Sequence, residues 1–301
     1  MMKKVIVVCG PTASGKTALA IGLAKKLNTE IVSADALLVY KGLNIGTAKP
    51  TEEEKEGVVH HLIDVVEPTE AFSVSDYERM ALPIVERLLE EGKTPILCGG
   101  TGFYIQSLLY KSGFGNAPAN DEVREKYERM AKEDGVQAVH DKLKSVDPES
   151  AEILHPNDLK RVIRALEIFE TTGKKKSDQC DERVPRFPFE AFCIDFPREE
   201  LYRRIDLRVD RMMQAGLIDE VKELLKSIPK TAQCMQGIGY KEIVEGMEEG
   251  LSLDSMSDII KRRTRNYAKR QQTFFKRMEH MHYLEPNGSQ IDEVLRILCQ
   301  T

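Results

Sequence analysis

The sequence lacks the cysteine spacings that mark a zinc ribbon or a disulfide framework. Its six cysteines are scattered, and no two of them form a C-x-x-C pair. This distribution indicates reduced thiols, so we expect a cytoplasmic protein. The six histidines form no convincing metal-binding set either. Nothing in the sequence therefore predicts a metal site held by cysteine or histidine.

Long apolar runs are also missing. No stretch approaches the roughly 18 consecutive apolar residues that a membrane-spanning helix needs, so we expect no membrane partner. Internal repeats and low-complexity segments are absent as well. The composition, with 41% hydrophobic and 31% charged residues, is ordinary for a globular protein. A chain of 301 residues can bury a substantial core, in one large domain or in two smaller ones.

What the sequence does contain is the octet GPTASGKT, which follows the apolar run KVIVVC and precedes the helical segment TALAIGLAKKL. This pattern predicts a phosphate-binding loop, because the glycines let backbone N–H groups turn toward phosphate oxygens. The lysine supplies a positive charge, the threonine hydroxyl can bind Mg²⁺, and the start of the helix adds a partial positive charge. We predict that a diphosphate or triphosphate is bound by the whole octet: Gly10, Pro11, Thr12, Ala13, Ser14, Gly15, Lys16 and Thr17.

Strands and helices alternate over the first third of the chain. We predict strands in KVIVVC, EIVSAD and TPILCGG, and helices after the octet, around SDYERMALPIVERLLEEG and from GTGFYIQSLLY onward. This order predicts an α/β fold of the P-loop NTPase type, with a parallel sheet and helices on both faces. Ligands of such sheets bind beyond the carboxyl ends of the strands. We therefore expect residues 10–17, Asp35 and residues 99–101 to meet at one site.

The character of the chain changes near residue 112. A link rich in Gly, Pro and Asn (SGFGNAPAND) leads into a charged region that is helical to about residue 176. The apolar segment FEAFCIDFP then restores strand character, and we expect three or four helices after it. We predict a P-loop catalytic core over residues 1–112 and about 188–301, with a helical insertion over about 113–187.

Several side chains could carry chemistry. Asp35 follows a strand, where a general base or a Mg²⁺-organising acid would stand, although a loop or cap aspartate fits equally well. Thr101, in a GGTG turn, could serve the site or cap a helix. Arg204, Arg208 and Arg211 share one helical face. They could neutralise charge on a phosphate or could form surface ion pairs.

The segment 261–277 is strongly basic. It holds eight Lys or Arg and no Asp or Glu, interleaved with Tyr267, Phe274 and Phe275. Such a segment can contact phosphates while its aromatic rings stack on bases. A solvated basic helix face is the alternative, but the lack of any compensating acid favours nucleic acid.

Seven segments, in order and covering nearly the whole chain, resemble the tRNA dimethylallyltransferases, also called tRNA isopentenyltransferases. They are GPTASGKT, SADALLVYKGLNIGTAKP, HHLIDVVEP, CGGTGFY, HPNDLKRVIRALEI, QGIGYKE and RNYAKRQQTFF. The octet alone does not distinguish this family from nucleotide kinases, whereas the YKGLNIGTAKP and GGTGFY segments are highly specific. The resemblance implies transfer of a dimethylallyl group from dimethylallyl diphosphate to N6 of adenosine at position 37 of tRNA. Diphosphate is released, and the loop holds the donor's diphosphate rather than ATP.

The resemblance also implies residue roles. Lys16, Thr17 with a Mg²⁺ cofactor and Arg208 would neutralise the leaving diphosphate, Asp35 would accept the amine proton, and Thr101 would hold the reacting centre. The tRNA-contacting positions that it implies are Asp35, Ala36, Leu37, Leu38, Thr101, Arg124, Lys160, Arg161, Arg164, Gly237, Tyr240, Lys241, Arg265, Lys269 and Arg270. One departure stands out. Many members have Ser after the aspartate and often Gln two residues later, whereas this chain has Ala36-Leu37-Leu38, whose side chains form no hydrogen bonds.

Other functions share the octet. A small-molecule or nucleotide kinase would use Asp35 as base and the arginines as phosphate clamps, but it leaves the basic segment without a role. An adenylate isopentenyltransferase shares the transfer chemistry but modifies a free nucleotide, and the basic segment again argues against it. A non-catalytic RNA-binding NTPase is the third alternative. We expect tRNA and dimethylallyl diphosphate as partners, and a monomer.

Overall fold

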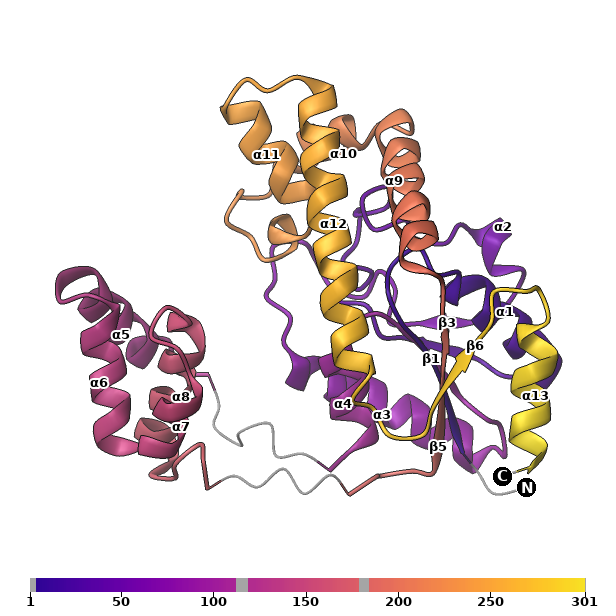
Figure 1. Ribbon diagram of the computed structural model, residues 1–301, viewed down its shortest axis with the longest axis horizontal. Helices are drawn as coiled ribbons and strands as arrows, with labels where there is room; N and C mark the ends of the chain where they lie inside the picture. The colour runs from indigo at the N-terminus through magenta and orange to yellow at the C-terminus, as the bar shows by residue number, and fades with distance from the viewer. Residues whose placement is uncertain (1–3, 112–118, 179–183, 301) are drawn as a thin grey trace. The chain divides into compact units, whose positions relative to one another are not determined.

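The computed structural model describes residues 4–111, 119–178 and 184–300. Contacts within the chain divide it into two compact units (Figure 1). Unit 1 comprises Met1–Tyr110 and Pro185–Thr301, and unit 2 comprises Lys111–Val184. The insertion predicted over about 113–187 differs from unit 2 by a few residues at each end. Most of the link predicted at 112–121 lies outside the described residues.

Unit 1 is built on a parallel sheet of six strands in the order β3-β2-β4-β1-β5-β6. The strands are β1 (Val5–Cys9), β2 (Ile31–Ser33), β3 (His60–His61), β4 (Ile96–Gly99), β5 (Phe189–Ile194) and β6 (Met281–Leu284). The predicted α/β fold with a parallel sheet is confirmed. The two edge strands β3 and β6 were not predicted. Their residues are mostly half-buried and lack the continuous apolar run that marks the inner strands.

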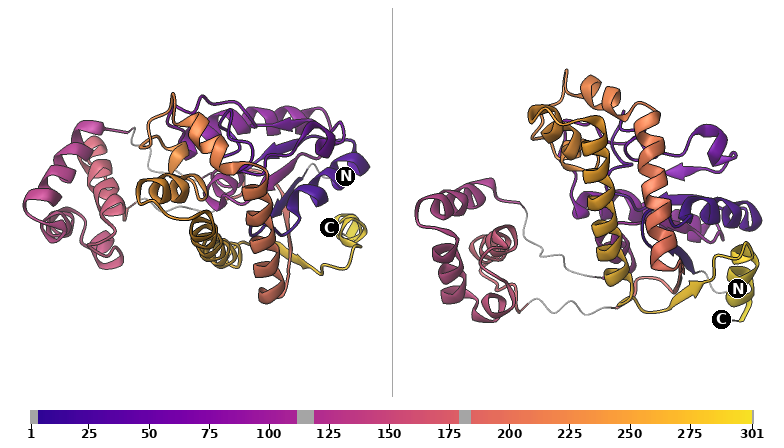
Figure 2. Two further views of the ribbon diagram at one scale, coloured as in Figure 1. Left: turned by 90° about the horizontal axis from the view of Figure 1, so that it is seen from above. Right: turned by 45° about the horizontal axis from the view of Figure 1, so that its top comes forward.

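Helices cover both faces of this sheet (Figures 1 and 2). Unit 1 contains α1 (Lys16–Leu27), α2 (Glu52–Lys55), α3 (Val74–Glu90), α4 (Gly102–Leu109), α9 (Arg198–Gln214), α10 (Leu217–Leu224), the 3₁₀ turn η1 (Cys234–Gln236), α11 (Tyr240–Glu248), α12 (Leu253–Phe275) and α13 (Gln290–Gln300). In the described chain five α-helices follow β5, so the expectation of three or four was wrong. Among the described residues no helix is both long and apolar enough to cross a membrane.

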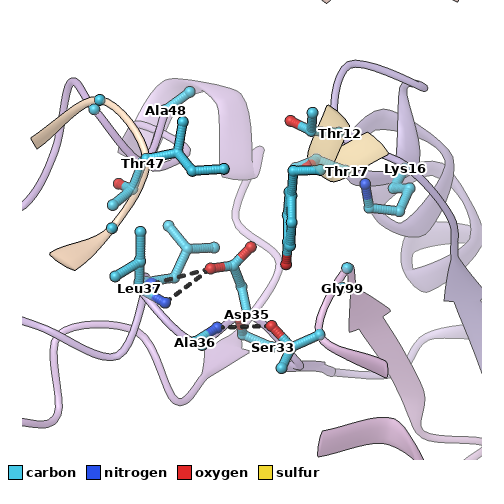
Figure 3. A pocket seen from close by; sticks show the side chains of 18 of the residues that line it. Thr12, Lys16, Thr17, Ser33, Asp35, Ala36, Leu37, Thr47, Ala48 and Gly99 are labelled. Carbon is cyan, nitrogen blue, oxygen red and sulfur yellow. Dashed lines mark hydrogen bonds between the residues drawn. The ribbon is translucent and has the colours of Figure 1, made fainter. Parts of the chain in front are cut away.

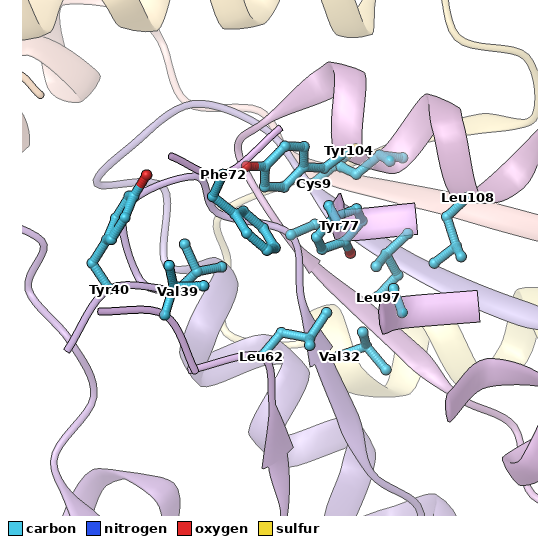
Figure 4. Packing of buried hydrophobic residues seen from close by; sticks show 14 of the residues in the cluster. Cys9, Val32, Val39, Tyr40, Leu62, Phe72, Tyr77, Leu97, Tyr104 and Leu108 are labelled. Atoms are coloured by element: carbon cyan, nitrogen blue, oxygen red, sulfur yellow. The ribbon is translucent and has the colours of Figure 1, made fainter. Parts of the chain in front are cut away.

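Successive strand residues supply two cores because their side chains alternate between the faces of the sheet. Val7 lies in the core beneath α3 and α4, whereas Val8 lies in the core beneath α1 and α13. In the first core the rings of Tyr77 and Tyr104 stack with their centres 4.1 Å apart (Figure 4). Residues of β1, β2 and β4 contribute to both cores, which anchor the strands that lead into the loops.

Unit 2 is a cluster of four helices with its own core. The helices are α5 (Asp121–Glu133), α6 (Val136–Val146), α7 (Pro148–Ile153) and α8 (Leu159–Thr172). Tyr127, Leu143 and Val162 lie at the centre and are at most 1% exposed. The side chain of Asn120 caps the start of α5, and Asp147 caps α7.

Candidate active site

A cavity of about 450 Å³ lies in unit 1 and is lined by the segments that follow β1, β2 and β4. Thr12, Lys16 and Thr17 line it from the phosphate-binding loop, Asp35 from the turn after β2, and Thr101 from the turn after β4. Figure 3 shows Asp35 between the Lys16 side and the loop that carries Thr47 and Ala48. The structure thus brings together the three segments that the sequence predicts to meet.

The phosphate-binding loop has the backbone that an anion site requires. Gly10 and Gly15 have φ values of 129° and 83°, which L side chains rarely adopt. Within the loop, Ser14 Oγ donates a hydrogen bond to the Pro11 carbonyl at 2.8 Å, and Lys16 Nζ donates to the same carbonyl at 2.6 Å. Gly15 precedes α1 and has no side chain with which to cap it, so the first N–H groups of the helix are left for a ligand.

Helix α9 supports the loop and adds a second cation. Arg204 Nε donates to the Ala13 carbonyl at 2.9 Å, and its guanidinium lies over the Phe196 ring at 4.5 Å. Arg208 lines the cavity, and its Nη2 donates to the Thr47 carbonyl at 3.1 Å. Arg211 is exposed and is not among the cavity-lining residues. Of the three arginines predicted to share a face, Arg204 thus contacts the loop and Arg208 lines the cavity.

Electrostatics in the cavity favour an anionic ligand. Burial lowers the pKa of Lys16, and the nearby charge of Arg208 lowers it further, whereas Asp35 opposes the shift. Burial likewise lowers the pKa of Arg208, and Asp35 again opposes it. Arg270 also lines the cavity, so three cations and one carboxylate leave an excess of positive charge, which a diphosphate would neutralise.

Asp35 and Thr101 are linked through the backbone of the turn after β2. Asp35 Oδ1 accepts hydrogen bonds from the N–H groups of Leu37 (2.9 Å) and Leu38 (3.4 Å). Its other oxygen points into the cavity (Figure 3). Thr101 precedes α4, but its Oγ1 accepts the Ala36 N–H at 3.0 Å instead of capping that helix. Each residue therefore combines a structural hydrogen bond with a place in the cavity wall.

Helix α12 closes the cavity with two side chains. Gln271, only 6% exposed, accepts the Thr12 N–H at 3.0 Å and donates to the Gly100 carbonyl at 2.9 Å. Tyr267 also lines the cavity, where burial and the nearby Asp35 raise its pKa to about 12. The role of Gln271 was missed from the sequence, and Arg204 was predicted to contact a phosphate or to form an ion pair, not to hold the Ala13 carbonyl. Gln271 lies in the RNYAKRQQTFF segment, but its partners are 259 and 171 residues away, so the segment does not reveal its contacts.

Comparison with known proteins bears on this arrangement. Residues 38–278 match the family model described as IPP transferase. The tRNA dimethylallyltransferase of Alkaliphilus oremlandii is 47% identical over 286 residues, which cover 94% of this chain and 91% of that protein. The chain belongs to the tRNA dimethylallyltransferase family. The enzyme of that name from Acetivibrio thermocellus is 46% identical over 296 residues, covering 97% of this chain and 95% of its own.

Solved structures of this family have the same fold. The tRNA isopentenylpyrophosphate transferase of Bacillus halodurans superposes with a TM-score of 0.74 at 38% identity, covering 99% of this chain and 96% of that one. A eukaryotic dimethylallyltransferase acting on tRNA superposes with a TM-score of 0.86 at 30% identity, covering 99% of this chain and 80% of that one. The resemblance drawn from seven sequence segments is thereby confirmed, as is the prediction of an enzyme of the prenyltransferase kind.

Within this family framework, the predicted tRNA-contacting residues of unit 1 divide into two groups. Ala36, Leu37, Leu38 and Gly237 line the cavity, with the Leu37 side chain packed against Gly237. Lys241 and Lys269 are exposed, and Arg265 forms an ion pair with Asp206 at 2.5 Å. Arg270 belongs to both groups, because it is exposed and also lines the cavity.

The structure does not support every aromatic prediction. Tyr240 is fully buried, and its hydroxyl donates to Glu220 at 2.7 Å, so its ring is not available for a direct tRNA contact. Phe275 is 1% exposed, so the prediction that its ring stacks on a base is wrong. The ring packs into the hydrophobic core of unit 1 instead. Phe274 lies edge-on to Phe103 with ring centres 5.5 Å apart.

In unit 2 the four predicted tRNA-contacting residues differ in their surroundings. Lys160 and Arg161 are exposed, and Arg161 lies 3.2 Å from Asp158. Arg124 and Arg164 instead approach the buried carboxylate of Glu167, at 2.9 Å and 2.7 Å. These two guanidinium groups stabilise a charge inside unit 2, whatever else they contact.

Proposed function

We propose that this chain transfers the dimethylallyl group of dimethylallyl diphosphate to N6 of adenosine 37 in tRNA, releasing diphosphate. The observation that carries the proposal is a single cavity that holds Lys16 and Arg208 together with Asp35. Apolar side chains, among them Leu37 and Val209, line the same cavity. This combination suits a diphosphate, a short hydrocarbon chain and an amine whose proton must be removed.

The donor half of the reaction concerns the diphosphate. When the bond between the allylic carbon and the diphosphate oxygen breaks, its electron pair goes to the leaving group, where negative charge grows. Lys16, Arg208 and the first N–H groups of α1 stabilise that charge. They cost little reorganisation, because the loop and Arg208 are already held by hydrogen bonds.

The cavity also fits Mg²⁺. Among the described residues no group of three His, Cys, Asp or Glu could hold a metal, but Mg²⁺ is commonly held by few protein oxygens together with substrate phosphates. The Thr17 hydroxyl lines the cavity next to Lys16 and would bind the ion alongside diphosphate oxygens. Bound there, Mg²⁺ would neutralise charge on the leaving diphosphate.

The acceptor half concerns the adenine. The N6 amine attacks the allylic carbon, and the cavity-facing oxygen of Asp35 accepts the proton that N6 loses. Thr101 fixes this carboxylate indirectly by accepting the Ala36 N–H of the same turn. An adenine amine is a weak nucleophile, so positioning supplies much of the rate, and the base must leave its stack to enter the cavity. The side chains of Ala36, Leu37 and Leu38 would contact it by shape alone.

Exposed cations provide the candidate tRNA surface. On unit 1 these are Lys241, Lys269 and Arg270, and on unit 2 they are Lys160 and Arg161. Their contribution would be sequence-independent and salt-dependent, as expected for phosphate contacts.

A transfer assay tests the proposal. The protein is incubated with Mg²⁺, carbon-labelled dimethylallyl diphosphate and either unmodified tRNA, the same tRNA with guanosine at position 37, or AMP. Label should enter only the tRNA with adenosine 37, and nuclease digestion should release N6-dimethylallyladenosine. Labelling of AMP would instead indicate an adenylate isopentenyltransferase. Transfer of γ-phosphate from labelled ATP to a small acceptor would contradict the proposal in favour of a kinase.

A further inference from the structure

We infer that Glu220 is a positioning residue, which sets the place of Arg208 in the active site through the loop of residues 43–48. The inference rests on the proposed function, in which Arg208 stabilises the leaving diphosphate. Glu220 is not among the cavity-lining residues, so any effect it has on the reaction must pass through other groups.

The carboxylate of Glu220, on α10, is surrounded by hydrogen-bond donors. Its Oε2 accepts the N–H groups of Asn44 (3.0 Å) and Ile45 (2.8 Å), and its Oε1 accepts the N–H of Gly46 (3.1 Å). The Tyr240 hydroxyl donates to the same Oε1 at 2.7 Å. Three successive N–H groups directed at one anion form a backbone nest, in which hydrogen bonds to a charged acceptor are stronger than neutral ones.

Tyr240 holds the loop from a second side. A Cβ atom added at Gly46 would lie 2.5 Å from the Tyr240 ring, so the ring packs directly on the loop backbone and excludes any larger residue there. Burial is the main cause that raises the pKa of Tyr240, and Glu220 raises it further. The hydroxyl therefore remains a hydrogen-bond donor throughout the physiological pH range.

The loop then connects to the cation. Thr47 follows the residues that Glu220 holds, and its own Oγ1 donates to the Leu43 carbonyl at 2.7 Å, which stiffens the turn. The Thr47 carbonyl accepts Arg208 Nη2 at 3.1 Å, and Thr47 lies on the cavity wall (Figure 3). A guanidinium has several donors in fixed geometry, so fixing one of them orients the others. Displacement of the loop would therefore move Arg208 relative to the diphosphate.

The first test replaces the carboxylate without changing its size. In Glu220→Gln the amide would turn a donor toward a backbone N–H, which should release the loop. We expect kcat to fall by about 10- to 100-fold, as for a small misplacement of a catalytic group, while KM for tRNA stays within about twofold. Glu223→Gln on the same helix is the matched control, because Glu223 is exposed and contacts Lys226. It should behave as wild type.

A double-mutant cycle with Arg208→Lys decides whether Glu220 acts through Arg208. We expect Glu220→Gln to cost less than about threefold when Arg208 is already replaced. If Arg208→Lys lowers kcat strongly and Glu220→Gln lowers it by the same factor in that background as in the wild type, the inference about Glu220 is overturned. The proposed function would still stand. Wild-type turnover of Arg208→Lys would overturn the role of Arg208 in the proposed function, and the inference with it.

A milder variant covers the case in which Glu220→Gln does not fold, as judged from its melting temperature. Tyr240→Phe removes one hydrogen bond to Glu220 and keeps the packed ring. It should lower kcat by about threefold to tenfold, and this loss too should disappear in the Arg208→Lys background. If Glu220→Gln does not fold and Tyr240→Phe keeps full activity, the position of the loop does not depend on the hydrogen bonds of Glu220. That result would overturn the inference.

Discussion

Asp35 combines two tasks in one carboxylate, and a single substitution can separate them. One oxygen accepts the N–H groups of Leu37 and Leu38, and the other faces the cavity. Asp35→Asn keeps an oxygen that can hold the turn but cannot accept the N6 proton. We expect kcat to fall about 1,000-fold, within the range for loss of a general base, with the Kd for tRNA unchanged. Single-turnover transfer and filter binding measure the two quantities.

The comparison with Asp35→Ala adds a control. Alanine removes the proton acceptor and the turn together, so it should lose activity at least as severely and should also lower the melting temperature. Near-normal turnover of Asp35→Asn, or a main effect on tRNA binding, would show that the base assignment is wrong.

Among single residues, those that belong to a sequence motif or follow a strand were predictable, and those whose contacts are distant in the sequence were not. Lys16 and Thr17 belong to a motif, and the predicted position of Asp35 followed from the end of a strand. Glu220 belongs to no motif, and Gln271 lies in the RNYAKRQQTFF segment, which gives no sign of which groups its side chain contacts. Glu220 accepts N–H groups 174 to 176 residues away, and Gln271 accepts one 259 residues away. Such roles depend on tertiary packing, which a single sequence does not display.

At the scale of elements, α12 ties the two halves of the site together. Gln271 bridges the Thr12 N–H of the phosphate-binding loop and the Gly100 carbonyl of the turn before Thr101. Gln271→Leu should leave both groups without a partner and lower kcat by about tenfold or more, with the Kd for tRNA unchanged. The neighbouring Gln272, which is less buried, offers the control Gln272→Leu. An equal loss of kcat in both variants would show that the effect comes from a general disturbance of α12 and not from the two hydrogen bonds of Gln271.

The exposed side of α12 makes a second prediction. Neutralising Lys269 and Arg270 to Gln should weaken tRNA binding and reduce the slope of log Kd against log salt by about 1 to 2, as for the loss of two phosphate contacts. The tandem Lys25 and Lys26 of α1 are also exposed and give a control with the same change in net charge. An unchanged slope in the α12 variant, or an equal change in the control, would remove this helix from the RNA surface.

For the molecule as a whole, the parallel sheet was predictable because its inner strands are apolar runs separated by amphipathic helices. The edge strands were not, since β3 has two half-buried residues and lies at the edge of the sheet beside β2. The helices after β5 were undercounted because short turns divide them, as at Gly216 between α9 and α10. The hydrophobic pattern of the sequence therefore predicts the inner strands of the sheet better than its edge strands or the junctions between helices.

The two compact units should unfold separately, because each has its own buried core. Leu143 in unit 2 and Leu108 in unit 1 are both fully buried, and truncating either to Ala should cost about 2–5 kcal/mol of its unit's stability. Calorimetry should therefore show two transitions, with Leu143→Ala lowering one and Leu108→Ala lowering the other by several degrees. Dimethylallyl diphosphate with Mg²⁺, at about 100 times its Kd, should add about 2.7 kcal/mol to the free energy of unfolding of unit 1, because its proposed site lies within that unit. It should therefore raise the temperature of the Leu108-sensitive transition and leave the other unchanged. A single transition shifted alike by both substitutions and by the ligand would contradict this independence.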